Sequence, residues 1–253
     1  MLTMNIPIKN KKEIAGMKKA CKKTAIVMNK LSKKIEPGIT TDYLNSMAEK
    51  LITELSCEPA FKGYMGYPKS ICTSINNEVV HGIPAIDRVL SEGDILSLDL
   101  GVISDGFYGD MAATFAVGNI SAEAERLIKT AKDSLYSGIA SALSGNSLGD
   151  ISSTIQSYVE ERGCSVVRKF VGHGIGRKLH EEPEIPNFGS PGVGPCLENG
   201  MILALEPMVN DGDYMVNISE DGWTAVTEDN SLSAHFEHTI LIWGSKPQIL
   251  TDF

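Results

Sequence analysis

The sequence predicts a mixed α+β fold, in which one domain spans the 253 residues and consists of two pseudo-equivalent halves, approximately 10–115 and 121–250. Three observations indicate this. Two pairs of helix-like segments occur, and each pair precedes strand-like sequence. GDILSLD (93–99) aligns with GMILALE (200–206) at an offset of 107 positions, as after an internal duplication. No Pro/Gly/Ser-rich linker separates the halves, and 42% of the residues are hydrophobic, enough for one large core.

Each half begins with two helices. Apolar residues recur at helical spacing through residues 10–35, and the segment PGITTD then ends this helix and caps a second one. In the second half SAEAERLIKTAKDSLYSGIASAL is predicted to be helical, SGNSLGD interrupts the pattern, and ISSTIQSYVEERG is predicted to be helical again. Gly38 and Gly145, which lie in the two interruptions, keep the offset of 107.

The segment ILSLDLGVISDGFYGDMAATF predicts a buried hairpin that Asp99 and Asp110 interrupt. One turn would place Asp99 directly opposite Asp110. A tight turn at Asp105-Gly106 would place Asp99 opposite Ala112, which leaves Asp110 one diagonal step away on the same face. A register between these two would separate the acids. In two of the three registers two negative charges share a buried face, where they must share a proton or bind a cation, and we carry the cation forward.

Carboxylates recur at matched places in the two halves. Asp99 and Glu206 each end an apolar run and each lie downstream of a His-Gly-Ile turn. These turns are VVHGIP around His81 and VGHGIG around His173, at an offset of 92. The repetition predicts a site on a pseudo-twofold axis between the halves.

The composition narrows the functional classes. A net charge of -9 disfavours binding of DNA over the whole surface. No window approaches eighteen consecutive apolar residues, and MLTMNIPIKNKKEIAGMKK lacks the apolar stretch of a secretory signal, so we expect a cytoplasmic protein without a membrane span. The lysine-rich segment IKNKKEIAGMKKACKK is interpreted as a solvated helix face, with contact to RNA or the ribosome as the alternative.

The cysteines indicate neither disulfides nor a thiolate metal site. They are odd in number, scattered, and never spaced as C-x-x-C: Cys21, Cys57, Cys72, Cys164 and Cys196. We expect buried or free thiols.

Acids and histidines in apolar or glycine-rich surroundings form a candidate metal site: Asp99, Asp110, His173, Glu206 and Glu237. Each alone has an ordinary explanation as a turn, cap or loop residue, and His235 and His238, which flank the Glu237 segment, have a weaker claim. Together, four carboxylates and one imidazole favour Mn, Fe(II), Co or Zn, and their charge matches two divalent ions. Two such ions can hold a bridging hydroxide at neutral pH.

Five segments, in order along nearly the whole chain, resemble the methionine aminopeptidases, specifically the short bacterial type I form of the pita-bread metallopeptidases. They are GYPKSICTSINNEVVHGIP, GDILSLDLGVISDGFYGD, VGHGIGRKLHEEPEIPNFG, MILALEPM and WTAVTEDNSLSAHFEHTI. The resemblance implies the pita-bread fold, with two pseudo-symmetric halves, antiparallel sheet and helices on the outer face. It also implies that the five residues above ligate two metals, with Asp110 and Glu237 bridging.

The resemblance further implies roles for residues around the metals. His81 would contact the substrate near its free amine and scissile amide, His180 would hydrogen-bond the scissile carbonyl region, and Glu206 would also shuttle a proton. The pocket for the first side chain would be lined by Tyr64, Tyr67, Cys72 and Trp223. Leu179 and Phe61 depart from many relatives, which affects the shape of this pocket.

The implied function is removal of the initiator methionine from nascent polypeptides whose second residue is small, by attack of the metal-bridging hydroxide on the first peptide carbonyl. The family also implies a monomer. An Xaa-Pro aminopeptidase or prolidase-like specificity is the second hypothesis, and a non-catalytic binding protein of the same fold is the third.

Overall fold

The computed structural model describes residues 6–252, so the first five residues of the segment inspected for a secretory signal lie outside the described residues. The first two helices form where the sequence predicts them. Helix α1 (Lys11–Ser32) begins after Asn10, whose side chain accepts from the backbone of Glu13 in a capping box. Helix α2 (Thr41–Glu54) begins after Thr40, whose hydroxyl accepts from the backbone of Tyr43.

The second helix pair differs from the prediction at one boundary. Helix α3 (Ala122–Ser141) follows the predicted segment, but α4 (Leu148–Glu160) begins three residues before the predicted start at Ile151. The reason is a capping box, in which the Ser147 side chain accepts from the backbone of Asp150 and the Asp150 carboxylate accepts from the backbone of Ser147. Part of SGNSLGD is therefore the first turn of the helix.

The strands form antiparallel sheets throughout the described residues. The four-stranded sheet has the order β1-β4-β2 with β5 paired to β4, and the five-stranded sheet has the order β15-β14-β9-β7-β8. The other two sheets have three strands each, in the orders β13-β10-β6 and β11-β12-β3. The strands are β1 (Glu58–Pro59), β2 (Ile71–Ile75), β3 (Glu78–Val80), β4 (Ile95–Ser104), β5 (Phe107–Ala116), β6 (Ser165–Val166), β7 (Gly172–Gly174), β8 (Glu181–Ile185), β9 (Ile202–Leu205), β10 (Met208–Asn210), β11 (Val216–Ile218), β12 (Ala225–Thr227), β13 (Ser233–His235), β14 (His238–Leu241) and β15 (Gln248–Ile249).

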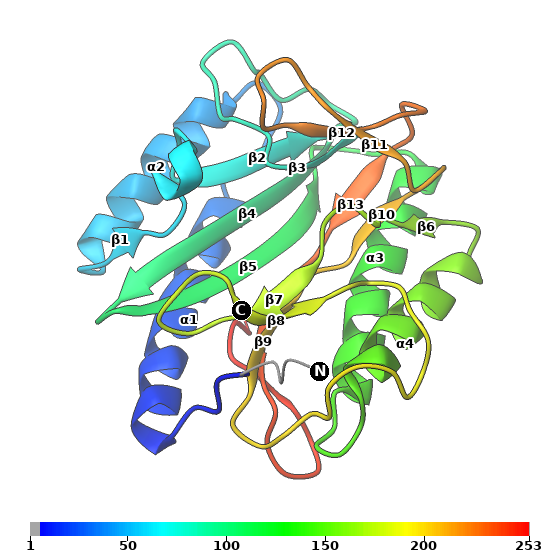
Figure 1. Ribbon diagram of the computed structural model, residues 1–253. Helices are drawn as coiled ribbons and strands as arrows, with labels where there is room; N and C mark the ends of the chain where they lie inside the picture. The colour runs from blue at the N-terminus through cyan, green and yellow to red at the C-terminus, as the bar shows by residue number, and fades with distance from the viewer. Residues whose placement is uncertain (1–5, 253) are drawn as a thin grey trace.

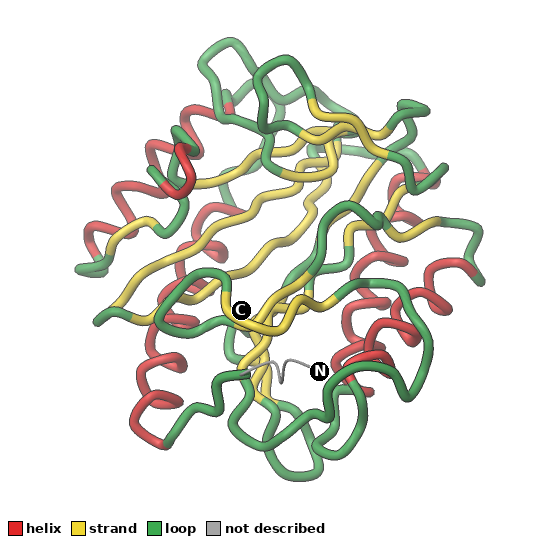
Figure 2. The backbone as a smooth tube through the Cα atoms, in the orientation of Figure 1, coloured by secondary structure: helices red, strands yellow, loops and turns green. Residues whose placement is uncertain are grey.

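The sheets lie in the middle of the molecule and the helices lie outside them (Figure 1). Helix α1 packs against β4 and β5, whereas α3 packs against β10 and β13. Figure 2 shows the resulting arrangement, with strands running through the centre and a helix pair on each side. The α+β class with antiparallel sheets and outer helices, as predicted, is confirmed. Among the described residues no helix is both long and apolar enough to cross a bilayer.

The hairpin of β4 and β5 adopts the tight-turn register. Asp105 and Gly106 both have positive φ, at 52° and 74°, as a two-residue hairpin turn requires. Asp99 lies opposite Ala112 and Asp110 lies opposite Gly101, so the two acids share one face at a diagonal step. Of the three alternatives that the sequence left open, this is the second.

Backbone contacts repeat at the offset of 107 positions. The N–H of Gly38 donates to Leu90, and the N–H of Gly145 donates to Leu197, at 2.8 and 2.9 Å. Both glycines have φ near +95°, a backbone conformation that residues other than glycine rarely adopt. The isolated bridges at the starts of α2 and α4 follow the same offset: Thr40 with Val89, and Ser147 with Cys196.

Candidate metal centre and substrate pocket

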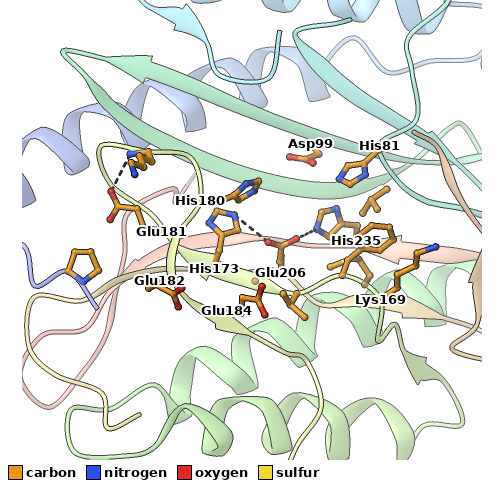
Figure 3. Close-up of a pocket in the computed structure, with 17 residues that line it drawn as sticks. His81, Asp99, Lys169, His173, His180, Glu181, Glu182, Glu184, Glu206 and His235 are labelled. Carbon is orange, nitrogen blue, oxygen red and sulfur yellow. Dashed lines mark hydrogen bonds and ion pairs between the residues drawn. The ribbon is translucent and has the colours of Figure 1, made fainter. Parts of the chain in front are cut away.

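Each of the five predicted metal ligands comes from a different place in the fold. Asp99 lies on β4 and Asp110 on β5, whereas His173 lies on β7. Glu206 directly follows β9, and Glu237 lies between β13 and β14. Figure 3 shows Asp99, His173 and Glu206 directed toward a common space between the sheets.

Glu237 lies between two strands and is held there by a backbone contact with β5. Its backbone N–H donates to the carbonyl of Ala112 on β5 at 2.8 Å, within the short segment that separates β13 from β14. Nearby, the hydroxyl of Thr239 donates to the carbonyl of Asp110, also at 2.8 Å. These bonds join β5 to the β13–β14 segment and bring Glu237 beside Asp110.

Three ligand atoms already lie at metal-binding distances from one another. One side-chain atom each of Asp110, His173 and Glu237 lies within 4.8 Å of the others. His173 Nε2 lies 3.5 Å from Glu206 Oε1. The other ring nitrogen, Nδ1, donates to the carbonyl of Gly174 at 2.9 Å, so Nε2 is left as the unprotonated, ligating nitrogen.

Burial controls the protonation of this cluster. It raises the pKa of Asp99 to about 7, and burial together with the neighbouring acids raises the pKa values of Asp110, Glu206 and Glu237 well above their usual range. Burial lowers the pKa of His173 to about 3, which keeps the imidazole neutral. Without a cation, ionising all four carboxylates is therefore unfavourable.

Unpartnered oxygens show that the cluster fits cations. Asp99 Oδ1, Asp110 Oδ1 and Glu237 Oε1 are buried and accept no hydrogen bond from the described residues. Buried polar atoms normally have partners, and a divalent ion would supply one for each of these three. Four carboxylates and one imidazole, without a thiolate, suit Mn, Fe(II), Co or Zn.

A cavity of about 160 Å³ lies beside the cluster. The structure places every residue predicted for metal binding, catalysis or the pocket on its wall: Tyr64, Tyr67, Cys72, His81, Asp99, Asp110, His173, His180, Glu206, Trp223 and Glu237. Phe61 and Leu179, the two departures from the family pattern, also line it. The residues selected from the sequence therefore lie around one cavity, and their roles remain predictions.

Aromatic side chains make the far wall of this cavity apolar. The rings of Tyr67 and Trp223 meet edge to face at 5.1 Å between centroids. The Tyr67 hydroxyl lies 3.1 Å from each of the carbonyls of Ile71 and Gly82, so its polar end is satisfied away from the cavity. Phe61 approaches closely because Gly101 has no side chain, and a Cβ there would lie 2.8 Å from the Phe61 ring.

The histidines stand between the cavity and the metal cluster. His81 has a left-handed φ of 63°, whereas His173 lies within β7, so the two His-Gly-Ile segments are not equivalent turns as predicted. His180 Nδ1 lies 2.7 Å from the Tyr64 hydroxyl, and its ring meets that of His173 edge to face at 4.3 Å. Burial lowers the pKa of His81 to about 4 and also lowers that of His180, so both rings are neutral at pH 7.

His235 lies closer to the candidate metal cluster than its sequence context indicates. Its buried Nε2 lies 3.9 Å from Glu206 Oε2 and has no hydrogen-bond partner among the described residues. Figure 3 shows Glu206 between His173 and His235. The available signal was spacing: in SAHFEHTI, His235 and Glu237 are two residues apart, which in an extended chain directs both to one side.

Met65 was also missed. It lines the cavity from a 3-10 turn (Tyr64–Gly66), has a positive φ of 48°, and is 82% exposed. A lone methionine in a loop gives no periodic signal, so nothing in the sequence indicated this contact.

The model of metallopeptidase family M24 matches residues 15–243. A protein of Clostridium acetobutylicum named methionine aminopeptidase is 53% identical over 97% of this chain and 98% of its own. The crystal structure of methionine aminopeptidase from Thermotoga maritima superposes with a TM-score of 0.97 at 47% identity, covering 98% of this chain and all of that one.

A prolidase from Pyrococcus horikoshii is more distant. Its structure has a TM-score of 0.79 at 21% identity, and the superposition covers 97% of this chain and 63% of the prolidase chain. This likeness concerns the fold alone, so the pita-bread fold is confirmed while the prolidase-like hypothesis is the less supported one. From the family match and the full-length relatives, the chain belongs to metallopeptidase family M24, among its methionine aminopeptidases.

Proposed function

We propose that this chain is a dimetal aminopeptidase that removes the N-terminal methionine from nascent polypeptides whose second residue is small. The observation that carries the proposal is one buried cluster of four carboxylates and His173 at the inner end of a small, mostly apolar cavity. The relatives named methionine aminopeptidase match this chain over nearly its whole length, and this supports the same substrate.

The residues that would hold two divalent ions are Asp99, Asp110, His173, Glu206 and Glu237, with Asp110 and Glu237 shared between the ions. Cobalt, manganese, iron(II) and zinc all suit these donors. Bound ions supply Lewis acidity toward a carbonyl oxygen and lower the pKa of water. The carboxylates neutralise the ions, and the carbonyl of Gly174 keeps His173 Nε2 directed at them.

The cavity suits a single unbranched side chain. Its volume of about 160 Å³ and its aromatic wall fit the flexible thioether of methionine. Phe61 and Leu179 are buried and line it, and the closed side leaves no room for a residue that precedes the N-terminal one. An N-terminal amine placed beside Asp99 would lie near His81.

We assign proton transfer to Glu206 and hydrogen bonding to the substrate to His180 and His81. The Glu206 carboxylate accepts the proton of the attacking water and returns it to the leaving amine. Because the Tyr64 hydroxyl can donate to His180 Nδ1, the proton of the neutral ring lies on Nε2, from which it donates to the scissile carbonyl oxygen. His81, neutral at pH 7, hydrogen-bonds the scissile amide.

We further propose that residues 1–253 form one catalytic domain of two related halves, active as a monomer in the cytoplasm. The contacts repeated at an offset of 107 support the relation between the halves. A transient contact with ribosomal RNA is proposed for the lysines that α1 exposes: Lys11, Lys12, Lys18, Lys19, Lys22 and Lys30. Neither DNA nor a membrane is a proposed partner.

The test uses metal-stripped protein and three tripeptides, Met-Ala-Ser, Leu-Ala-Ser and Ala-Pro-Ser, with and without added Mn or Co. We expect release of the first residue from Met-Ala-Ser alone, and only with metal. Cleavage chiefly of Ala-Pro-Ser would instead assign the protein to the Xaa-Pro class. No cleavage of any peptide by metal-loaded protein would contradict an enzymatic function.

A further inference from the structure

A second, larger hollow of about 740 Å³ continues outward from the metal cluster. We call it the outer cleft. It shares five wall residues with the inner cavity: His81, Asp99, His173, His180 and Glu206. If the inner cavity holds the first side chain, as the proposed function requires, then the rest of the polypeptide must leave through the outer cleft.

One wall of the outer cleft is acidic. Along β8 the side chains alternate, so that Pro183 and Ile185 are buried while Glu182 and Glu184 are exposed on the cleft side. Neither of these two glutamates forms an ion pair with any residue that the structure describes. Their neighbour Glu181 differs, because it pairs with Lys9 and accepts from the backbone of Arg177. The acidic wall therefore consists of Glu182 and Glu184.

The acidic wall lies next to the site of reaction. Glu184 is the cross-strand partner of His173. In Figure 3, Glu184 lies between Glu182 and Glu206, whereas Lys169 lies at the other end of the cleft. Lys178 also lines the cleft, from the turn before β8. The backbone N–H of Lys178 donates to Glu181, so this lysine belongs to the same end of the cleft as β8. The two unpaired carboxylates of Glu182 and Glu184 nevertheless lie together where an outgoing chain would pass.

We propose that the acidic wall selects polypeptides with lysine or arginine at the third or fourth position. The inference rests on the proposed function and specifies its substrate. An extended chain advances about 3.3 Å per residue, so the residues just beyond the small second one pass β8. A basic side chain there gains an ion pair with Glu182 or Glu184, whereas an acidic one meets repulsion.

The expected effect of a charge at the third or fourth position on kcat/KM is that of one exposed ion pair. Such pairs change an equilibrium by about two- to fivefold, so kcat/KM should change by a similar factor for each charge. Because the wall is exposed, added salt should reduce the preference.

The experiment compares kcat/KM for metal-loaded protein on Met-Ala-X-Ser-Ser and Met-Ala-Ser-X-Ser, with Lys, Gln or Glu as X. The Gln peptide is the reference for each variant. In the wild type we expect Lys to exceed Glu by about fivefold or more at one of the two positions, at low ionic strength. Equal rates for Lys and Glu at both positions would overturn the inference, while cleavage of the Gln peptide would leave the proposed function intact.

Variants assign the preference to the acidic wall. We expect the ratio of Lys to Glu rates to fall toward one in the Glu182→Gln, Glu184→Gln double variant, and to rise in Lys169→Gln, which removes the opposite charge from the same cleft. Glu36→Gln is the matched control, because Glu36 is an exposed acid in the turn after α1 and should keep the wild-type ratio. A double variant with the wild-type ratio would overturn the inference.

Discussion

At the residue scale, the site depends on side chains that are unfavourable without a ligand. Asp99, Asp110 and Glu237 each carry a buried oxygen without a hydrogen-bond partner, and each has a raised pKa. An isolated buried charge of this kind destabilises a fold. The simplest explanation is that the fold is completed by cations held at these oxygens.

Replacing one predicted ligand should remove activity, and at saturating metal its effect on stability should not unfold the protein. We expect His173→Ala to lower kcat/KM for Met-Ala-Ser by more than about a hundredfold at saturating Mn, because it deletes the only nitrogen donor of the cluster. Circular dichroism should remain that of the wild type. A folded variant with wild-type turnover would exclude His173 from the ligand set.

His235 gives a second prediction at this scale. Its Nε2 lies 3.9 Å from Glu206 Oε2, where it can orient that carboxylate. We expect His235→Ala to lower kcat by about tenfold with little change in KM, and His235→Gln to recover much of the loss because an amide can donate to the same oxygen. A rise in KM with unchanged kcat would show that His235 acts in substrate binding instead.

At the element scale, caps fix where the helices begin and tie the helix starts to neighbouring loops. The start of α4 was predicted too late because the glycines and serines of SGNSLGD indicate a break, whereas the capping box with Ser147 as N-cap begins the helix at Leu148. Asp150 also accepts from the backbone of Gly192, so this cap ties α4 to a distant loop.

Removing this cap should cost stability without affecting chemistry. We expect Ser147→Ala to lower the free energy of unfolding by about 1 kcal/mol in urea denaturation. Ser147→Thr should keep most of it, because the hydroxyl remains. Ser153→Ala, inside the same helix, is the control and should be neutral or slightly stabilising. Equal effects of Ser147→Ala and Ser153→Ala would show that the cap contributes nothing.

At the scale of the whole molecule, the metal cluster joins the two helix-and-sheet groups. Asp99 and Asp110 come from the first sheet, whereas His173, Glu206 and Glu237 come from strands of the second half of the sequence. Loss of the cation should consequently lower the free energy of unfolding of the whole molecule, and the size of this effect should depend on pH.

In metal-free protein the pKa of Asp99 is raised from 3.8 to about 7 by burial. A raised folded-state pKa means that this group's stability contribution is fully present below pH 4 and is lost as the pH rises through about 7. Buried histidines such as His173, with lowered pKa values, act in the opposite direction below about pH 6.5.

Comparing the wild type with Asp99→Asn separates the contribution of Asp99 from that of the buried histidines. We expect the free energy of unfolding of metal-free Asp99→Asn minus that of the wild type to increase as the pH rises from 4 to 7. Urea denaturation at each pH measures both values. Parallel curves for the two proteins would contradict a raised pKa for Asp99.

Local patterns in the sequence predicted the helices and the β4–β5 hairpin. They did not predict how distant segments contact one another around the site. Helical periodicity located the four helices, and Asp105-Gly106 was one of the turns foreseen for the β4–β5 hairpin. Repetition between the halves pointed to Asp99 and Glu206. What escaped prediction depends on contacts between distant segments: the hydrogen bond from Glu237 to Ala112, and the place of His235 beside Glu206. The two-residue spacing of His235 and Glu237 was the local signal for the second of these, whereas no local pattern indicates the contact of Glu237 with Ala112.

The most direct test of the account is anomalous X-ray scattering from crystals of the protein grown with Mn²⁺. We predict two manganese peaks between the sheets, both in contact with Asp110 and Glu237. The remaining ligands should be Asp99, His173 and Glu206. Manganese found only at surface carboxylates, or no peak within this cluster, would contradict the central claim that these five residues form a dimetal site.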